Sequence, residues 1–139
     1  MAEGYYTLTF AGIGDEYPVR QEIRAMYKAQ GKEPPKAMDD TVMYNRGILW
    51  AAVHVEAIRN ALKATGGKQP TGEDVNKGFE QIQDFILGGL VPPLKMTGAD
   101  HEGGGWVQVF QVRDGKFVKE TDWFRAYPEV VAAAVKKSE

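Results

Sequence analysis

The stretch TVMYNRGILWAAVHVEAIRNAL (Thr41–Leu62) decides the fold, because its length and apolar spacing predict one long helix. Short oxygen-bearing side chains, Asp39, Asp40 and Thr41, lie where the free N–H groups of its first turn need acceptors. The sequence ATGGKQP, residues 64–70, contains glycine and proline and follows the last apolar residues. We therefore expect a central helix with its first turn beside these oxygens and its end near residue 64.

The middle of this helix is apolar on nearly every side. Its polar side chains would form a single stripe, which Leu49, Ala52 and Val53 interrupt at mid-helix. The residues of the stripe are Asn45, Arg46, Glu56, Arg59, Asn60 and Lys63. A helix that is apolar all round needs cover on more than one side. The sequence therefore predicts a covering layer that the other expected elements are too few to supply.

Two more helices are expected on either side of the central one. The first is amphipathic, ends at Gly31 and can be capped by Asp15. The second begins at a capping box formed by Thr71 and Asp74 and extends over about residues 72–86. The two apolar stripes are Val19, Ile23, Met26 and Tyr27, and Val75, Phe79, Ile82 and Ile86.

Strands are expected only near the two ends of the chain. YYTLTF predicts a strand over Tyr5–Phe10, and Asp114–Gly115 is a strong hairpin signal between WVQVFQV and KFVKE. No strand lies close to the first one in sequence, so we expect it to be unpaired. A last helix is expected in YPEVVAAAVKK, with Pro128 in its first turn.

Composition excludes several classes of function. The 139 residues are 43% hydrophobic and 26% charged, which indicates one globular domain or a piece of one. The net charge of -2 with interleaved signs argues against nucleic-acid binding and against an anionic membrane surface. No apolar run predicts membrane insertion. The absence of cysteine excludes disulfides and thiolate chemistry.

Motifs for catalysis or cofactor binding are weak. Gly12 and Gly14 follow a strand, but the third glycine of a dinucleotide-binding turn is absent, so a strand-ending turn is the better interpretation. His54 lies on the apolar helix, where a buried, hydrogen-bonded histidine is more usual than a catalyst. The aromatic side chains near the two ends are more typical of core or docking positions than of ligand stacking. They are Tyr5, Tyr6, Trp123, Phe124 and Tyr127.

The sequence ADHEGGG holds Asp100, His101 and Glu102, but adjacent loop residues rarely converge on one ion, so a solvated loop is expected and no metal. The chain has one serine, Ser138, near its end, which leaves no ordinary serine nucleophile. We predict no enzyme and no cofactor.

One polar cluster suits a ligand. Tyr44, Asn45 and Arg46 bring hydroxyl, amide and guanidinium donors to the first turns of the central helix, where the helix dipole also favours an anion. With Asp39 and Thr41 beside them, these residues could hold a carboxylate. In an equally weighted alternative, Tyr44 packs, Asn45 and Arg46 face water, and the aspartates only cap the helix.

Five stretches keep the order and spacing of a known family over essentially the whole chain. They are AEGYY at a strand start, YNRGILWAAVHVEAIRNAL, GEDVNKGFEQI, GGLVPPLKMTGADHEGGG and VQVFQVRDGKFVKETDW. Together they resemble the type I periplasmic solute-binding proteins of ABC importers, in the branched-chain amino acid receptor group. The forms PPLKMTGADH and TDWF look most like the branch that takes up aromatic and other carboxylic acids.

The resemblance implies an α/β fold that is an incomplete, C-terminal piece of a two-lobed binding protein. Residues 1–10 would be a hinge strand, residues 11–90 the helical part of the first lobe, and residues 91–139 the hairpin and the terminal helix. The upstream sheets of both lobes, and most ligand-binding groups of the family, would be absent. Only the region from Asp39 to Asn45, and more weakly Phe10, would then touch ligand.

By this resemblance, the parent protein captures a small carboxylate-bearing solute in the periplasm, a branched-chain amino acid or an aromatic acid, and delivers it to an ABC permease. The alternative is a self-contained α/β interaction module without a small-molecule ligand. An enzyme that uses Asp100 and His101 is a third possibility. Uncovered apolar surface and sheet edges also predict a homodimer.

Overall fold

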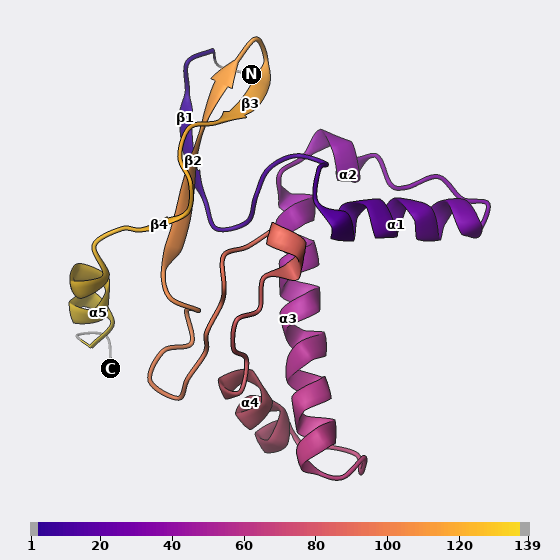
Figure 1. Cartoon of the computed structure of the whole chain (residues 1–139), viewed down its shortest axis with the longest axis vertical. Helices are drawn as coiled ribbons and strands as arrows, with labels where there is room; N and C mark the ends of the chain where they lie inside the picture. Colours follow the sequence, from indigo (N-terminus) through magenta and orange to yellow (C-terminus); the bar gives the residue numbers. More distant parts are fainter. Residues whose placement is uncertain (1–2, 137–139) are drawn as a thin grey trace.

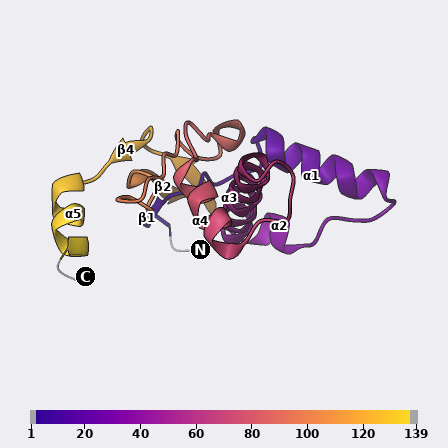
Figure 2. The same ribbon diagram turned by 90° about the horizontal axis from the view of Figure 1, so that it is seen from below.

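The computed structural model describes residues 3–136 and shows a narrow β-sheet beside a set of helices (Figure 1). The elements are β1 Tyr6–Thr9, α1 Pro18–Ala29, α2 Ala37–Asp40, α3 Met43–Ala64, α4 Gly72–Glu80, the 3-10 turn η1 Leu87–Gly89, β2 Trp106–Arg113, β3 Lys116–Lys119, β4 Phe124–Arg125 and α5 Pro128–Lys136. In the view from below, α1 and α5 lie at opposite ends of the molecule, with α3 and the sheet between them (Figure 2). The mixed α/β class and the order of elements agree with the sequence.

The sheet is antiparallel and centred on β2. β1 pairs with one edge of β2, with Tyr6 opposite Gln111, and β3 and β4 pair along the length of the same strand. The turn Asp114–Gly115 has φ of 51° and 71°, as a two-residue hairpin turn with matching twist requires, so the predicted hairpin is confirmed. The prediction of an unpaired first strand is wrong, because the partner of β1 lies about a hundred residues later in the chain.

The N-terminus of α1 corrects one predicted cap. Tyr17 occupies the cap position without a side-chain hydrogen bond, and Pro18 begins the helix. Asp15 instead pairs with Arg20 and Arg24 on the first turns of α1. Both guanidinium groups offer a stronger, charge-assisted partner than a backbone N–H.

The long helix is confirmed, but its start is shifted. The residues Ala37–Asp40 form a separate one-turn helix, α2, and Thr41 is extended with φ -146° and ψ 140°. The hydroxyl of Thr41 accepts a hydrogen bond from the N–H of Met43, the first residue of α3. Of the three predicted capping residues, Thr41 therefore supplies an acceptor to the first turn.

The capping box at the start of α4 is confirmed, since Thr71 and Asp74 satisfy each other's backbone N–H groups. The predicted extension to residue 86 is wrong, because the helix ends at Glu80. Beyond it the carbonyl of Ile82 accepts a hydrogen bond from the N–H of Met96. A bridge between Phe85 and Leu94 then replaces helical bonding, so tertiary pairing overrides the apolar stripe.

The core lies between one face of α3, α4 and the segment that returns from α4 to the sheet. Its buried residues are Ala11, Leu49, Val53, Ala57, Ile82, Val91 and Leu94. α4 crosses α3 closely at Gly78, where Asn60 also donates a hydrogen bond to the Gly78 carbonyl over 3.1 Å. The opposite face of α3 is exposed, which agrees with the prediction that the other elements are too few to cover this helix.

One smaller prediction about burial is wrong. His54 is exposed, and its Nδ1 lies 2.7 Å from the Trp50 carbonyl on the preceding turn. Most of the aromatic residues expected in the core or at docking positions are exposed, with Tyr127 at 74%, so they lie outside the core and their docking role stays a prediction. Among residues 3–136, no helix combines the length and apolar character needed to cross a bilayer.

Candidate functional site

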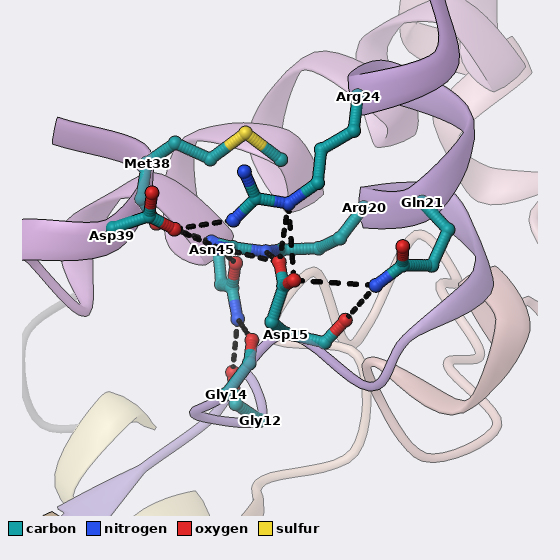
Figure 3. A network of polar contacts seen from close by, with 9 residues as sticks. All are labelled: Gly12, Gly14, Asp15, Arg20, Gln21, Arg24, Met38, Asp39 and Asn45. Atoms are coloured by element: carbon teal, nitrogen blue, oxygen red, sulfur yellow. Dashed lines mark hydrogen bonds and ion pairs between the residues drawn. The ribbon is translucent and has the colours of Figure 1, made fainter. Parts of the chain in front are cut away.

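A cluster of charged and amide side chains joins α1, α2, α3 and the loop that follows β1. We call Asp15, Arg20, Arg24, Asp39 and Asn45 the Arg20 cluster (Figure 3). Arg20 lies at its centre and is only 4% exposed. The burial of a guanidinium group requires that its donors be paired, and here they are.

Each nitrogen of Arg20 has a partner. Nε donates to Asp15 over 2.7 Å, and Nη1 donates to the carbonyl of Met38 over 2.6 Å and to Asn45 Oδ1 over 2.9 Å. Nη2 lies 2.7 Å from Asp15 and 3.4 Å from Asp39. The side chain therefore ties three helices and a loop together and has no donor left for a ligand.

The polar atoms of Asn45 are also fully used in hydrogen bonds within the protein. It is 2% exposed, and its Nδ2 donates to the carbonyls of Gly12 and Gly14 over 2.8 and 3.0 Å. Its Oδ1 accepts from Arg20. Both N–H groups are used, so the amide fixes the turn after β1 against α3.

Two carboxylates balance two guanidinium groups in this cluster. Asp39 pairs with Arg24 as well as with Arg20. Partial burial raises the pKa of Asp15, but hydrogen bonds from Arg24 and Arg20 and their positive charge outweigh it, so the pKa lies below its ordinary value. The hydrogen bonds to Asp15 and Asp39 raise the pKa of Arg24. The cluster holds two carboxylates and two guanidinium groups, so its formal charges balance.

An apolar groove of about 760 Å³ runs beside the cluster, between α3, α1 and residues 85–87. Thr41 and Tyr44 line one end of it, and Arg59 lines it further along α3. A smaller hollow of about 310 Å³ lies between the Arg20 cluster and the hairpin turn. The first groove has the size of a small-molecule site, with few polar groups on its wall.

Arg46 is the one member of the predicted site with a buried donor that has no partner among the described residues. Its guanidinium lies over the ring of Phe10, with 4.9 Å from the central carbon to the ring centre, and Nη1 lies 3.6 Å from the sulfur of Met43. Its Nε is buried without a hydrogen-bond partner among the described residues. An unpaired buried donor costs free energy, about 1–3 kcal/mol, which an added acceptor would recover.

The five residues singled out from the sequence therefore divide into two groups. Asp39 and Asn45 make internal contacts in the Arg20 cluster, whereas Thr41 and Tyr44 line the groove and Arg46 packs on Phe10. Sequence reasoning missed Arg20, the central member of the cluster. The available signal was the pair of arginines one helical turn apart in α1, five and nine residues after Asp15.

The weaker motifs carry no assembled site in the described residues. A side chain at Gly12 would place its Cβ 1.9 Å from the Tyr17 hydroxyl, so this glycine serves close packing. Burial, together with Glu16, raises the pKa of Tyr17 to about 12. In residues 3–136 no three potential metal-ligating side chains gather, and His101 lies 3.6 Å from Glu80 on the surface. Ser138 lies outside the described part of the chain.

Two solved structures resemble the chain over nearly its whole length. A protein described as an ABC transporter permease from the Pseudomonas fluorescens group superposes with a TM-score of 0.77 at 30% identity, covering 98% of this chain and 37% of that one. A branched-chain amino acid ABC transporter protein from Thermus thermophilus, solved with bound valine, superposes with a TM-score of 0.75 at 23% identity, covering 98% and 36%. The chain thus spans little more than a third of either protein. No protein-family model and no curated protein matches it.

Proposed function

We propose that this chain is part of a periplasmic solute-binding protein of the branched-chain amino acid ABC transporter group and that it serves in the capture of a small carboxylate-bearing solute. The solute is a branched-chain amino acid or an aromatic acid, which an ABC permease then accepts in the periplasm. The observation that carries this proposal is the structural match over 98% of the chain to two ABC transporter proteins.

The proposed mechanism is closure of two lobes around the solute. Residues 1–10 and the returning hairpin act as the connection between lobes, and residues 11–90 supply one wall of the cleft. Burial of the charged solute among fixed donors stabilises the closed form, whose surface the permease recognises.

In the ligand site we assign contact roles to Thr41, Tyr44 and Arg46. Thr41 and Tyr44 line the groove, whereas Arg46 does not, and its buried Nε without a partner among the described residues is the donor that we assign to a carboxylate. Asp39 and Asn45 contribute to the site by holding α2 and the start of α3 in place, since their polar atoms are engaged with Arg20, Arg24 and the loop after β1.

The test compares the chain alone with a chimera in which it replaces the matching part of the Pseudomonas fluorescens group protein. Titration calorimetry with valine, leucine and benzoate should show no strong binding to the chain alone, because one wall of a cleft gives little affinity. The folded chimera should bind one of these carboxylates with micromolar affinity. A folded chimera that binds none of the three would overturn the proposal.

Three variants of the chimera test the site assignment. Tyr44→Ala and Arg46→Ala should each weaken binding by about tenfold, the loss of roughly one charge-assisted or hydroxyl hydrogen bond. His101→Ala is the matched control, since this side chain is exposed and lies beside Glu80. Equal losses in all three variants would contradict the assignment.

A further inference from the structure

The hairpin turn Asp114–Gly115 contains the two neighbouring residues of this chain that are best suited to a spontaneous rearrangement of the backbone. The chain has one aspartate followed by glycine, and no asparagine followed by glycine. At such a position the glycine nitrogen can attack the side-chain carbonyl carbon of the aspartate, because glycine has no side chain to hinder the approach. Both residues are exposed, and open space surrounds the Cβ position of Gly115. Within residues 3–136 no neighbouring atom therefore blocks this glycine sterically.

The rearrangement passes through a five-membered ring and needs only water. The Gly115 nitrogen bonds to Cγ of Asp114, and the hydroxyl of the carboxylic acid leaves as water with the proton of that nitrogen. A water molecule then adds to the backbone carbonyl carbon of Asp114 and breaks its bond to the Gly115 nitrogen. The product is isoaspartate, which has the same atoms as aspartate but one more carbon in the main chain.

The carboxylate of Glu3 engages both backbone N–H groups of this turn. Its Oε1 accepts a hydrogen bond from the N–H of Asp114 over 3.0 Å, and its Oε2 accepts one from the N–H of Gly115 over 3.4 Å. The nitrogen of this second N–H is the one that would attack Asp114. A carboxylate beside it opposes loss of the proton and holds both peptide groups toward Glu3. Ring closure therefore requires the turn to rotate away from Glu3 first.

The position of Glu3 is fixed by the end of the sheet. The N–H of Gly4 donates to the carbonyl of Val112 over 2.9 Å, and Nε2 of Gln111 donates to the carbonyl of Gly4 over 3.3 Å. The residue after Glu3 is thus tied to the strand that leads into the turn. The contact between Glu3 and the turn joins positions 111 and 112 residues apart, so it exists only in the folded chain.

We propose that Asp114–Gly115 is a site of isoaspartate formation and that Glu3 suppresses the reaction in the folded chain. An extra main-chain carbon in the two-residue turn would disturb the pairing of Arg113 with Lys116, because the register of a hairpin depends on the length of its turn. Gly115 and Lys116 also line the 310 Å³ hollow beside the Arg20 cluster, so the product would alter one wall of that hollow. The inference depends on the geometry of the turn and not on the proposed ligand site.

The test measures isoaspartate at residue 114 while the purified chain is incubated at neutral pH. Peptide mapping with electron-transfer fragmentation distinguishes isoaspartate from aspartate, and enzymatic methylation of isoaspartate gives an independent measure. Glu3→Ala should raise the rate about three- to tenfold over the parent chain, the factor expected when one exposed hydrogen bond is lost. Glu3→Gln keeps one acceptor oxygen and should give an intermediate rate. The peptide VRDGKF, residues 112–117, should react faster than the parent chain.

Glu120→Ala is the matched control. Glu120 pairs with Arg113 over 2.7 Å at the same end of the hairpin, but the contact joins two side chains and leaves the N–H groups of the turn with Glu3. This variant should form isoaspartate at the rate of the parent chain. Asp114→Glu should abolish the signal, because a longer side chain cannot close the five-membered ring. Circular dichroism and a thermal melt verify that each variant is folded before its rate is compared.

Four results would overturn the inference. They are a parent chain that reacts as fast as the peptide, a folded Glu3→Ala or Glu3→Gln variant that reacts no faster than the parent chain, a folded Glu3→Ala variant with isoaspartate only at other positions, and a Glu120→Ala variant accelerated as much as Glu3→Ala. The last result would attribute the protection to the general stability of the hairpin instead of the contact between Glu3 and the turn.

Discussion

Gly78→Ala tests the closest approach in the core, where α4 crosses α3. A Cβ built on Gly78 would lie 2.1 Å from the carbonyl oxygen of Ala57 and 3.3 Å from the backbone nitrogen of Ala61. The obstructing atoms are backbone, so no side-chain rotation relieves the clash. α4 must then move away by about 1 Å, which loosens its packing and the hydrogen bond from Asn60.

The size of the effect follows from two opposing terms. Overpacking costs about 3 kcal/mol where the clash is with backbone, and alanine regains about 1 kcal/mol over glycine in a helix. We therefore expect the free energy of unfolding to fall by about 2 kcal/mol, or the melting temperature by about 6–8 °C for a chain of this size. Urea unfolding followed by circular dichroism measures the first quantity and a thermal melt the second.

Gly47→Ala is the matched control, because Gly47 lies inside α3 with open space around its Cβ position. This variant should gain about 0.5–1 kcal/mol from reduced chain entropy. The opposite signs of the two glycine substitutions distinguish a close contact from helix propensity. Gly78→Ala as stable as the parent chain would refute the close crossing of α4 and α3.

Three further predictions concern the Arg20 cluster and assembly. Arg20→Met should destabilise the chain by about 1–3 kcal/mol in urea unfolding, because it leaves the Asn45 amide oxygen and the Met38 carbonyl without their buried donor, while Asp15 and Asp39 keep Arg24 as a partner. Arg59→Met, at an exposed ion pair, should stay within about 0.5 kcal/mol. Because the pKa of Asp15 is lowered in the folded chain, its ion pairs stabilise the fold above the ordinary carboxyl pKa, and this stability is lost as pH falls through the folded pKa. The Asp15→Asn variant should therefore be less stable than the parent chain at pH 7. It should also lose less stability than the parent chain below about pH 4. Parallel stability profiles for parent and variant would contradict this. β1 and β3 are edge strands of the described sheet, and exposed edges favour pairing with another chain. Sedimentation at micromolar concentration should therefore show a homodimer, in which Trp50 stays accessible. A monomer would contradict this prediction.

The sequence alone determined the elements whose signals are local. The presence and the end of α3 followed from a long apolar periodic stretch, the start of α4 from the Thr71 and Asp74 capping box, and the hairpin from Asp114–Gly115. Each signal depends on backbone geometry within a few residues, so no distant contact was needed to interpret it. The sequence also predicted that α3 lacks cover, because the helix has more apolar surface than the other expected elements can bury.

Tertiary structure decided what depends on distant partners. β1 pairs with β2, which lies about a hundred residues later in the chain, and no local sequence pattern predicts this pairing. α4 ends early because the N–H of Met96 donates a hydrogen bond to the carbonyl of Ile82. The end of a helix depends on competition between its own hydrogen bonds and those offered by other segments.

The candidate site shows the same division. The sequence placed Asp39, Thr41, Tyr44, Asn45 and Arg46 near the start of the long helix, but it could not say which of them have polar atoms left for a ligand. That was decided by Arg20, which comes from another helix and engages Asp39 and Asn45 from within the protein. The capacity of a polar group to bind a solute depends on what is left after its internal hydrogen bonds are made, and only the folded arrangement fixes those bonds.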